Sequence, residues 1–415
     1  ESFGMGVGQA TMKAQGQGTQ KIKERAWAWW PLVPIYPYQQ RRTLRRELVK
    51  DWMWSFEQVQ GIFYVVVPIR MTVVRLEAGG LLVYAPVAPT PECLRLLREL
   101  EATYGAVRYI IHPTISGLEH KVFVGPFARQ CPQAQVFVAP SQWSFPVSLP
   151  LSWLGFPGGR TQVLPEASSQ APFAAEFDYE ILGPIFLGPG RFAEVALFHR
   201  RSRSLLVTDT IVAVPSEPPE IVQQDPYPLL FHAKDSGAEA IADTPANRVK
   251  GWRRIALFAF YFRPSCLDVT ETGRSLQDIK QAPDRSRQAY FGWFPFRWKY
   301  GWEQSFAALQ GNGRPFVAPI LQQLILNRAP DVTLAWAKKV ARWDFQQIVP
   351  CHLDAPIAAT PLDFQRAFGF LEPAIAASSS QSLLPAADFE LLRTIDDRLS
   401  RARIVPPAKT SPLNA

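Results

Sequence analysis

The sequence has little cysteine, little histidine and no long apolar run. Its four cysteines, at positions 93, 131, 266 and 351, form no C-x-x-C pair and no metal-finger spacing, which excludes a cysteine-based zinc module and favours a reducing compartment. The longest apolar runs, residues 61–69 and 255–262, are far shorter than the ~20 residues that a membrane-crossing helix needs. The sequence therefore predicts no transmembrane helix. With five histidines, a histidine-based site has few candidates.

Charged residues are also sparse, whereas proline is abundant. Only 19% of the residues are charged and 47% are hydrophobic, so the chain can build a large core and lies outside the disordered class. Proline accounts for 38 of 415 residues, well above the roughly 5% of an average protein, which argues against a helical bundle, a coiled coil or a helical repeat array. The length corresponds to two or three domains of about 150 residues, a range that one large α/β unit with extensions also satisfies.

Positive charge is concentrated at the beginning of the chain. The net charge is +8, and residues 1–50 contain nine basic and three acidic residues, which leaves the remainder nearly neutral. We define residues 1–58 as a basic, aromatic N-terminal arm. Its first 20 residues lack the apolar core of a secretory signal, which is typical of a mature or internal start. Three prolines in residues 31–37 indicate an extended segment. The arm offers these candidate contacts for a partner or a membrane: Arg25, Trp27, Trp29, Trp30, Arg41, Arg42, Arg45 and Arg46.

The rest of the chain alternates between strand and helix patterns. Short β-branched runs at 62–68, 71–76 and 81–84 predict antiparallel strands, with residues 69–70 as the first connection. Thr90 and Pro91 then begin an amphipathic helix. Further strands are expected at 107–111, 135–139, 177–182, 194–199 and 205–209, and further helices near 122–130, 247–260, 303–308, 317–327, 332–340, 361–371 and 387–401. This alternation is typical of the α/β class. We predict one domain over 59–375 with a helical insertion at about 225–345, and a C-terminal helix and tail over 376–415.

Three polar side chains follow predicted strands, where α/β folds place their sites. His120 stands in the loop after the strand at 107–111, Asp209 ends L-L-V-T-D, and His352 follows the short strand at 347–350. Taken singly, each histidine is more often a hydrogen-bonded structural residue than a ligand.

Taken together, these segments resemble the motif series of the metallo-β-lactamase superfamily. Its first metal motif, H-x-H-x-D-H, falls on residues 115–120, and its P-G-H element falls on residues 189–191. The resemblance covers about residues 60–375 and implies an αββα sandwich with one or two metals at strand ends. Three metal-binding histidines are replaced by Ile115, Gly117 and Arg191, which cannot ligate a metal as imidazole does. The second site of the family matches Glu119, His120, Asp209 and His352.

Two consequences of this resemblance stay open. In one, Arg191 occupies the vacated metal position as an anion-binding or pseudo-site cation, pairs with Asp209 or Glu119, and leaves a non-catalytic pocket without any cofactor. In the other, Glu119, His120, Asp209 and His352 hold one divalent metal, Zn, Fe or Mn, in a single-metal hydrolase.

Longer stretches resemble a more specific group, an uncharacterised protein family of cyanobacteria and plastids with a divergent metallo-β-lactamase-like domain. The stretches are residues 65–74, 117–127, 143–146 and 149–156, which are rich in Trp and Pro. This resemblance implies a location in the plastid stroma or the cyanobacterial cytoplasm, peripheral to the thylakoid membrane.

A second segment that mixes aromatic and basic residues covers 285–302 and contains Trp293, Trp298 and Trp302. Such residues suit a membrane interface with anionic lipid headgroups, although Trp and Phe are equally typical of packed cores. Nucleic acid is not favoured as a partner because the charge is confined to one arm and no reader motif is present. We therefore predict a non-catalytic peripheral or auxiliary subunit, or an assembly factor, of a thylakoid membrane complex, with the single-metal hydrolase as the alternative.

Overall fold

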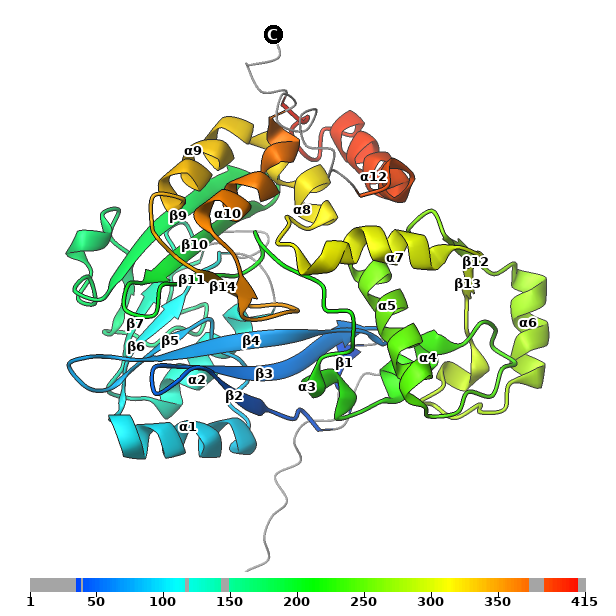
Figure 1. Ribbon diagram of the computed structural model, residues 1–415, viewed down its shortest axis with the longest axis horizontal. Helices are drawn as coiled ribbons and strands as arrows, with labels where there is room; N and C mark the ends of the chain where they lie inside the picture. Colours follow the sequence, from blue (N-terminus) through cyan, green and yellow to red (C-terminus); the bar gives the residue numbers. More distant parts are fainter. Residues whose placement is uncertain (1–34, 39, 116–118, 143–148, 373–383, 410–415) are drawn as a thin grey trace, which may run out of the picture.

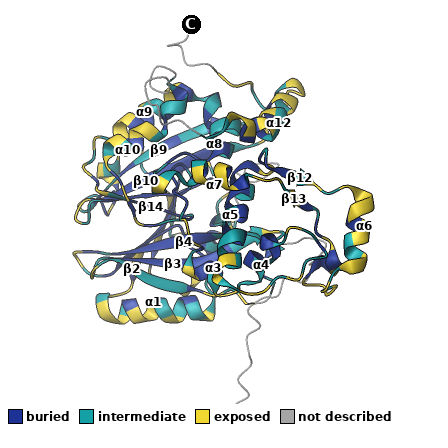
Figure 2. Ribbon diagram, turned by 45° about the vertical axis from the view of Figure 1, so that its right-hand side comes forward, coloured by how far each residue is buried: buried dark blue, intermediate teal, exposed yellow. Residues whose placement is uncertain are grey.

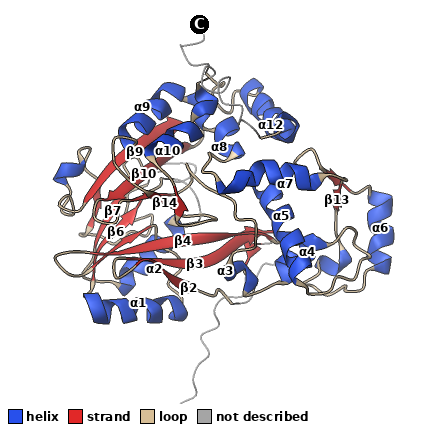
Figure 3. Ribbon diagram, viewed as in Figure 1, coloured by secondary structure: helices blue, strands red, loops and turns tan. Residues whose placement is uncertain are grey.

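The computed structural model describes residues 35–38, 40–115, 119–142, 149–372 and 384–409 of the chain. Its main part consists of two β-sheets packed against each other, with helices on the outer face of each sheet (Figure 1 and Figure 3). These four layers are the αββα sandwich that the sequence predicts. Residues of both sheets fill the space between them, including Leu82, Val195, Leu206 and Val349. Figure 2 shows that the sheets are largely buried, whereas exposed residues lie on the outward sides of α1 and α6.

The first sheet has eight strands in the order β1-β3-β4-β5-β6-β7-β8, with β2 also pairing with β3. Their bounds are β1 Ile35–Tyr36, β2 Leu44–Val49, β3 Met53–Ile62, β4 Val65–Arg75, β5 Leu81–Tyr84, β6 Val107–His112, β7 Gln135–Val138 and β8 Thr161–Val163. Neighbours from β5 to β8 are parallel, so the chain must cross over between them. Helices α1 (Pro91–Tyr104) and α2 (Lys121–Gln130) make the first two crossovers and cover the outer face of the sheet.

Of two sequence predictions for this part of the fold, one is confirmed and one is wrong. The cap of α1 is as predicted, since the Thr90 side chain accepts a hydrogen bond from the Cys93 amide. The predicted connection at residues 69–70 is wrong, because β4 runs through them without a break. The hairpin turns instead at Phe63 and Tyr64, which both adopt positive φ angles, of 53° and 61°.

The second sheet has five strands in the order β15-β14-β11-β10-β9. Their bounds are β9 Phe177–Phe186, β10 Arg191–His199, β11 Ser204–Val207, β14 Gln347–Pro350 and β15 Ile357–Ala358. Strands β11 and β14 are parallel, and the other pairs are antiparallel. The outer face is covered by α9 (Pro330–Val340) and α10 (Pro361–Ala367). Because β11 and β14 are adjacent and parallel, the loops that follow them leave the sheet at the same edge.

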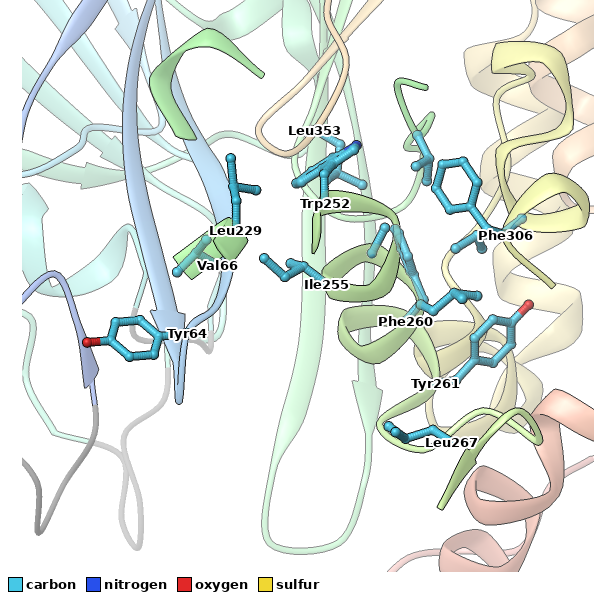
Figure 4. Close-up of a cluster of buried hydrophobic side chains, with 14 of the residues drawn as sticks. Tyr64, Val66, Leu229, Trp252, Ile255, Phe260, Tyr261, Leu267, Phe306 and Leu353 are labelled. Carbon is cyan, nitrogen blue, oxygen red and sulfur yellow. The ribbon is translucent and has the colours of Figure 1, made fainter. Parts of the chain in front are cut away.

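Besides α9, six α-helices lie in the chain between β11 and β14. They are α3 Glu220–Gln223, α4 Tyr227–Ala233, α5 Pro245–Tyr261, α6 Thr272–Gln281, α7 Trp302–Gln310 and α8 Pro319–Leu324, together with the paired strands β12 Leu267–Val269 and β13 Phe296–Trp298. Figure 4 shows their shared core, in which Trp252, Ile255 and Phe306 lie near one another. Tyr64, at the tip of the β3–β4 hairpin, belongs to the same cluster, so the insertion is built onto the first sheet.

The remaining described elements are the helix near the C-terminus and six single-turn 3₁₀ helices. They are α12 Glu390–Arg401 and the 3₁₀ helices Ser168–Gln170, Tyr290–Gly292, Gly311–Gly313, Leu326–Arg328, Gly369–Leu371 and Ala386–Phe389. Among the helices of the described residues, none has the length and apolarity that crossing a bilayer requires.

Candidate metal centre

Three loops at the ends of strands bring three potential metal ligands together. Glu119 precedes α2, Asp209 follows β11, and His352 follows β14. The Nε2 atom of His352 lies 3.2 Å from Oε2 of Glu119 and 3.1 Å from Oδ1 of Asp209. The three donor atoms all lie within 4.8 Å of one another. The structure thus brings together three of the four residues that sequence resemblance assigned to one metal, and we call them the three-donor cluster.

His120, the fourth of those residues, lies beside the three-donor cluster but is not part of it. Its ring centroid is 6.1 Å from that of His352. The side chain is buried, its Nδ1 lies 3.1 Å from the carbonyl oxygen of Pro86, and its Nε2 has no hydrogen-bond partner among the described residues. An unpartnered polar atom of this kind is costly unless a ligand or water reaches it.

The backbone fixes which nitrogen of His352 can face the carboxylates. Nδ1 of His352 lies 3.2 Å from the carbonyl oxygen of Pro68. Because a carbonyl only accepts hydrogen bonds, Nδ1 must carry a hydrogen, and in a neutral imidazole the Nε2 atom then bears a lone pair. A lone pair that faces two carboxylate oxygens is repelled, so a cation must lie between these groups. That cation is either a proton on Nε2 or a metal ion.

The pKa values of His352, Glu119 and His120 depend on burial and on the charges of one another and of Asp209. Burial alone would lower the pKa of His352, but the carboxylates of Glu119 and Asp209 raise it well above the usual value. Burial would likewise raise the pKa of Glu119, yet the opposing His352 charge lowers it to about 2. Burial and the neighbouring His352 lower the pKa of His120, so His120 is neutral at pH 7. In the absence of metal, a proton therefore bridges the three-donor cluster.

A buried carboxylate that sequence reasoning missed holds Asp209 in place. Glu194, in β10, is fully buried and accepts hydrogen bonds from the amides of Thr208, Asp209 and Thr210, at 3.0, 2.8 and 3.0 Å. It also accepts one from the Thr210 hydroxyl, at 2.6 Å. Burial and the nearby Asp209 raise the pKa of Glu194. The only signal in the sequence was one acidic residue inside the apolar run F-A-E-V-A-L-F.

Arg191 is not part of this arrangement. Its guanidinium lies 5.2 Å from the ring centroid of Phe186, at the start of β10. Among the described residues it makes no ion pair with Glu119 or Asp209, so the structure does not support Arg191 as the cation of the vacated metal position. Ile115, another of the replaced histidines, is buried in the core between the sheets. Gly117 lies outside the described residues.

The described part of the arm, residues 35–38 and 40–58, and part of the second aromatic segment pack within the fold. Strands β1 and β2, which fall within the predicted arm, pair with β3. Its four described arginines bind within the fold: Arg41 donates to the Val59 carbonyl, and Arg42, Arg45 and Arg46 pair with Glu92, Glu99 and Glu57. The rings of Trp298 and Trp302 lie 5.2 and 4.9 Å from the buried guanidinium of Arg254. These six predicted contact residues therefore have structural partners.

The other predicted contact residues divide into two groups. Trp293 is 44% exposed and stays available to a partner. Arg25, Trp27, Trp29 and Trp30 lie outside the described residues.

The donor atoms of the cluster suit a divalent transition metal. Two carboxylate oxygens and one imidazole nitrogen, with a second imidazole beside them, form a mixed O/N set of the kind that Zn²⁺, Mn²⁺ and Fe²⁺ accept. The bond from Nδ1 of His352 to a backbone carbonyl is the outer contact that orients metal-ligating histidines. The residues present therefore fit one metal ion.

Comparisons with known proteins place the chain in a family and find similar structures. The family model "Domain of unknown function (DUF4336)" matches residues 50–370. No curated protein matches the sequence. The structure is similar to a crystal structure of the DIM-1 metallo-β-lactamase exposed to ceftazidime, with 11% identity, 42% of this chain and 74% of that chain covered, and a TM-score of 0.33.

Two further similar structures come from Nostoc sp. PCC 7120 and Synechocystis sp. PCC6803. A putative diflavin flavoprotein A 5 fragment from Nostoc sp. PCC 7120 has 10% identity, covers 81% of this chain and 99% of its own, and gives a TM-score of 0.38. The metal-soaked Flv1 flavodiiron core from Synechocystis sp. PCC6803 has 12% identity, covers 89% of this chain and 71% of its own, and gives a TM-score of 0.40.

Proposed function

The chain belongs to the DUF4336 family, and we propose that it binds one divalent metal ion, Zn²⁺, Fe²⁺ or Mn²⁺, at Glu119, Asp209 and His352 and acts as a single-metal-dependent hydrolase. One observation carries this proposal. Nε2 of His352 faces two carboxylate oxygens at 3.2 and 3.1 Å, while Nδ1 is committed to a backbone carbonyl. This arrangement requires a cation where a ligated metal would lie.

An open side of the cluster supports catalysis rather than a structural metal. The side chains of Glu119 and Asp209 are 41% and 33% exposed, so solvent and a substrate can reach them. Structural zinc sites are closed, whereas catalytic sites keep a position open. When bound, the metal supplies Lewis acidity and lowers the pKa of a water molecule.

His120 has a distinct part in this proposal. Because burial and His352 lower its pKa, it is a neutral imidazole at pH 7. Its Nδ1 is held by the Pro86 carbonyl, so its unpartnered Nε2 is free to accept a proton. We assign it the role of proton acceptor next to the metal.

The test is elemental analysis of purified protein together with hydrolysis of activated probes, p-nitrophenyl acetate and bis-p-nitrophenyl phosphate. The wild-type protein should contain an equimolar amount of metal, and His352→Ala should lose both metal and hydrolysis. His120→Ala should keep the metal and lose hydrolysis. His199→Gln, which alters a buried histidine whose Nδ1 binds Ser202, is the control and should change neither. A wild-type protein without metal would refute the proposal.

A second candidate is the non-catalytic role, as a peripheral or auxiliary subunit or assembly factor of a photosynthetic membrane complex. Exposed aromatic side chains in the insertion favour it, namely Phe291, Trp293 and Tyr300. The half-exposed cations Arg297 and Lys299 accompany them and share a single carboxylate, that of Asp268. In this case His352 keeps its proton and no metal binds. The resemblance to cyanobacterial and plastid proteins would place such a subunit in the stroma or cytoplasm, peripheral to the thylakoid.

Vesicle flotation tests this second candidate. The protein should float with vesicles of phosphatidylglycerol and phosphatidylcholine but not with phosphatidylcholine alone, because cations attract anionic headgroups. Trp293→Ala should weaken flotation, whereas Trp153→Ala, which removes an exposed tryptophan outside the insertion, should not. Equal flotation of both variants would contradict a membrane role for the insertion.

A further inference from the structure

We infer that Arg70, held by Glu57, is the positioning residue of His352. The inference rests on the metal centre proposed above and names a part of that centre that lies outside its ligands. Arg70 donates hydrogen bonds to the carbonyl oxygens of Pro350 and Leu353, at 2.5 and 2.6 Å. These two carbonyls bracket His352 in the chain, so one planar guanidinium fixes the backbone on both sides of the ligand.

The same stretch of β4 holds the His352 segment at other points. Ile69 and His352 form an antiparallel bridge, and the Pro68 carbonyl accepts the hydrogen of His352 Nδ1. Leu353, directly after the ligand, has a positive φ of 58°, a conformation that non-glycine residues rarely adopt without support. Residues 68–70 thus hold a strained loop in one orientation.

Glu57 supplies the charge that keeps Arg70 in this place. Its Oε1 accepts from Nε of Arg70 at 3.0 Å and from Nη2 of Arg46 at 2.6 Å. Arg70 and Glu57 are only 1% and 2% exposed. Buried ion pairs contribute little net stability compared with apolar residues of similar size, but they impose a defined geometry. The geometry imposed here is that of the loop that carries His352.

Lysine cannot replace Arg70 in this role. The guanidinium uses Nε, Nη1 and Nη2 for three different partners in one plane, whereas an ammonium is a compact point charge. Arg70→Lys therefore keeps the positive charge but loses the paired hydrogen bonds to the carbonyls on either side of His352.

The experiment compares Arg70→Lys with Arg328→Lys. Arg328 is an equally buried arginine paired with Asp396, remote from the three-donor cluster, so it controls for the general cost of disturbing such a pair. Zn²⁺ affinity is measured by competition with a chelator, and stability by urea unfolding. We expect Arg70→Lys to weaken Zn²⁺ binding by about 10- to 100-fold, as changes in outer contacts of metal ligands do. Arg328→Lys should stay within about twofold because remote sites act independently.

Two further measurements keep the test decisive. If Arg70→Lys does not fold, Glu57→Gln, which keeps the shape of the side chain and removes its charge, takes its place with the same expected result. If the wild-type protein binds no Zn²⁺, the proposed function fails, and ¹⁵N NMR of the His352 ring then tests the inference alone. Its signals should move in Arg70→Lys and stay in Arg328→Lys. Equal affinity, or equal ring signals where no metal binds, in the two variants would overturn the inference.

Discussion

Replacing Glu194 by glutamine should destabilise the protein far more than the same change on the neighbouring strand. The carboxylate accepts four hydrogen bonds, two at each oxygen. In Glu194→Gln the amide oxygen can keep the bonds from the Asp209 and Thr210 amides, and the Thr210 hydroxyl can turn to accept from the new NH₂ group. The Thr208 amide then faces that NH₂ group and has no acceptor.

The magnitude follows from these losses. A buried amide without an acceptor costs about 1–3 kcal/mol, and the two remaining bonds lose the assistance of the charge, roughly another 1 kcal/mol. We expect a loss of about 2–4 kcal/mol in the free energy of unfolding, measured by urea denaturation. Because the Thr208–Thr210 loop carries Asp209, metal uptake should fall as well.

Glu180→Gln is the matched control for this change. Glu180 lies in the adjacent strand β9, and its carboxylate makes an exposed ion pair with Lys339 at 3.4 Å. Exposed pairs contribute about 0–1 kcal/mol, so this variant should unfold almost as the wild type does. If Glu194→Gln lost no more stability than Glu180→Gln, the conclusion that Glu194 holds the Asp209 loop would be refuted.

Three further predictions concern stability. Burial lowers the pKa of His199 to about 4, so the folded state favours the neutral ring. The stability that His199 contributes is present above the unfolded pKa of about 6.5 and is lost as the pH falls towards 4. Urea titrations from pH 7 to 4 should therefore show a shallower loss for His199→Gln than for the wild type, by about 2–3 kcal/mol. Gly251→Ala should unfold at lower urea than the wild type because its Cβ would lie 1.8 Å from the carbonyl oxygen of Leu229, whereas Gly273→Ala, with open space around it, should not. Arg254→Met should cost about 1–3 kcal/mol by urea denaturation, because the carbonyl oxygen of Lys234, directly after α4, loses its donor, whereas Asp235 keeps its ion pair with Lys250. Metal content should stay unchanged.

The sequence indicated the site better than it indicated the strands that support it. Asp209 and His352 could be found because each follows an apolar strand, and strand ends converge in α/β folds. Glu119 was assigned by the resemblance to the metallo-β-lactamase motif series. Arg70 could not be placed, because a charge inside an apolar run is typical of a turn. Its partner Glu57 is 13 residues away on the neighbouring strand, and only the pairing of β3 with β4 makes a buried charge tolerable.

The structural partners of four arginines in the arm could not be predicted for a related reason. Clustered arginines are typical of a surface for an acidic partner, but their partners here lie within the chain. Arg42 pairs with Glu92, 50 residues later, and Arg45 pairs with Glu99. Charge along the sequence does not show which acidic groups the fold brings to it. Arg42 and Arg45 therefore fasten the described part of the arm to α1.

The nature of one cation decides between the two candidate functions. Three species could neutralise Glu119 and Asp209 next to His352: a guanidinium, a proton or a metal ion. The position of Arg191 over Phe186 removes the first. The hydrogen bond from Nδ1 of His352 to a backbone carbonyl leaves Nε2 to bind either the proton or the metal ion. Nε2 carries a hydrogen in the first case and donates its lone pair to the metal in the second. A proton makes the pocket an internal ion pair that needs no further ligand, and a metal makes it a reaction centre with neutral His120 beside it. Metal and proton exclude each other at Nε2, so a metal-loaded protein cannot at the same time contain the sealed ion pair of a non-catalytic pocket.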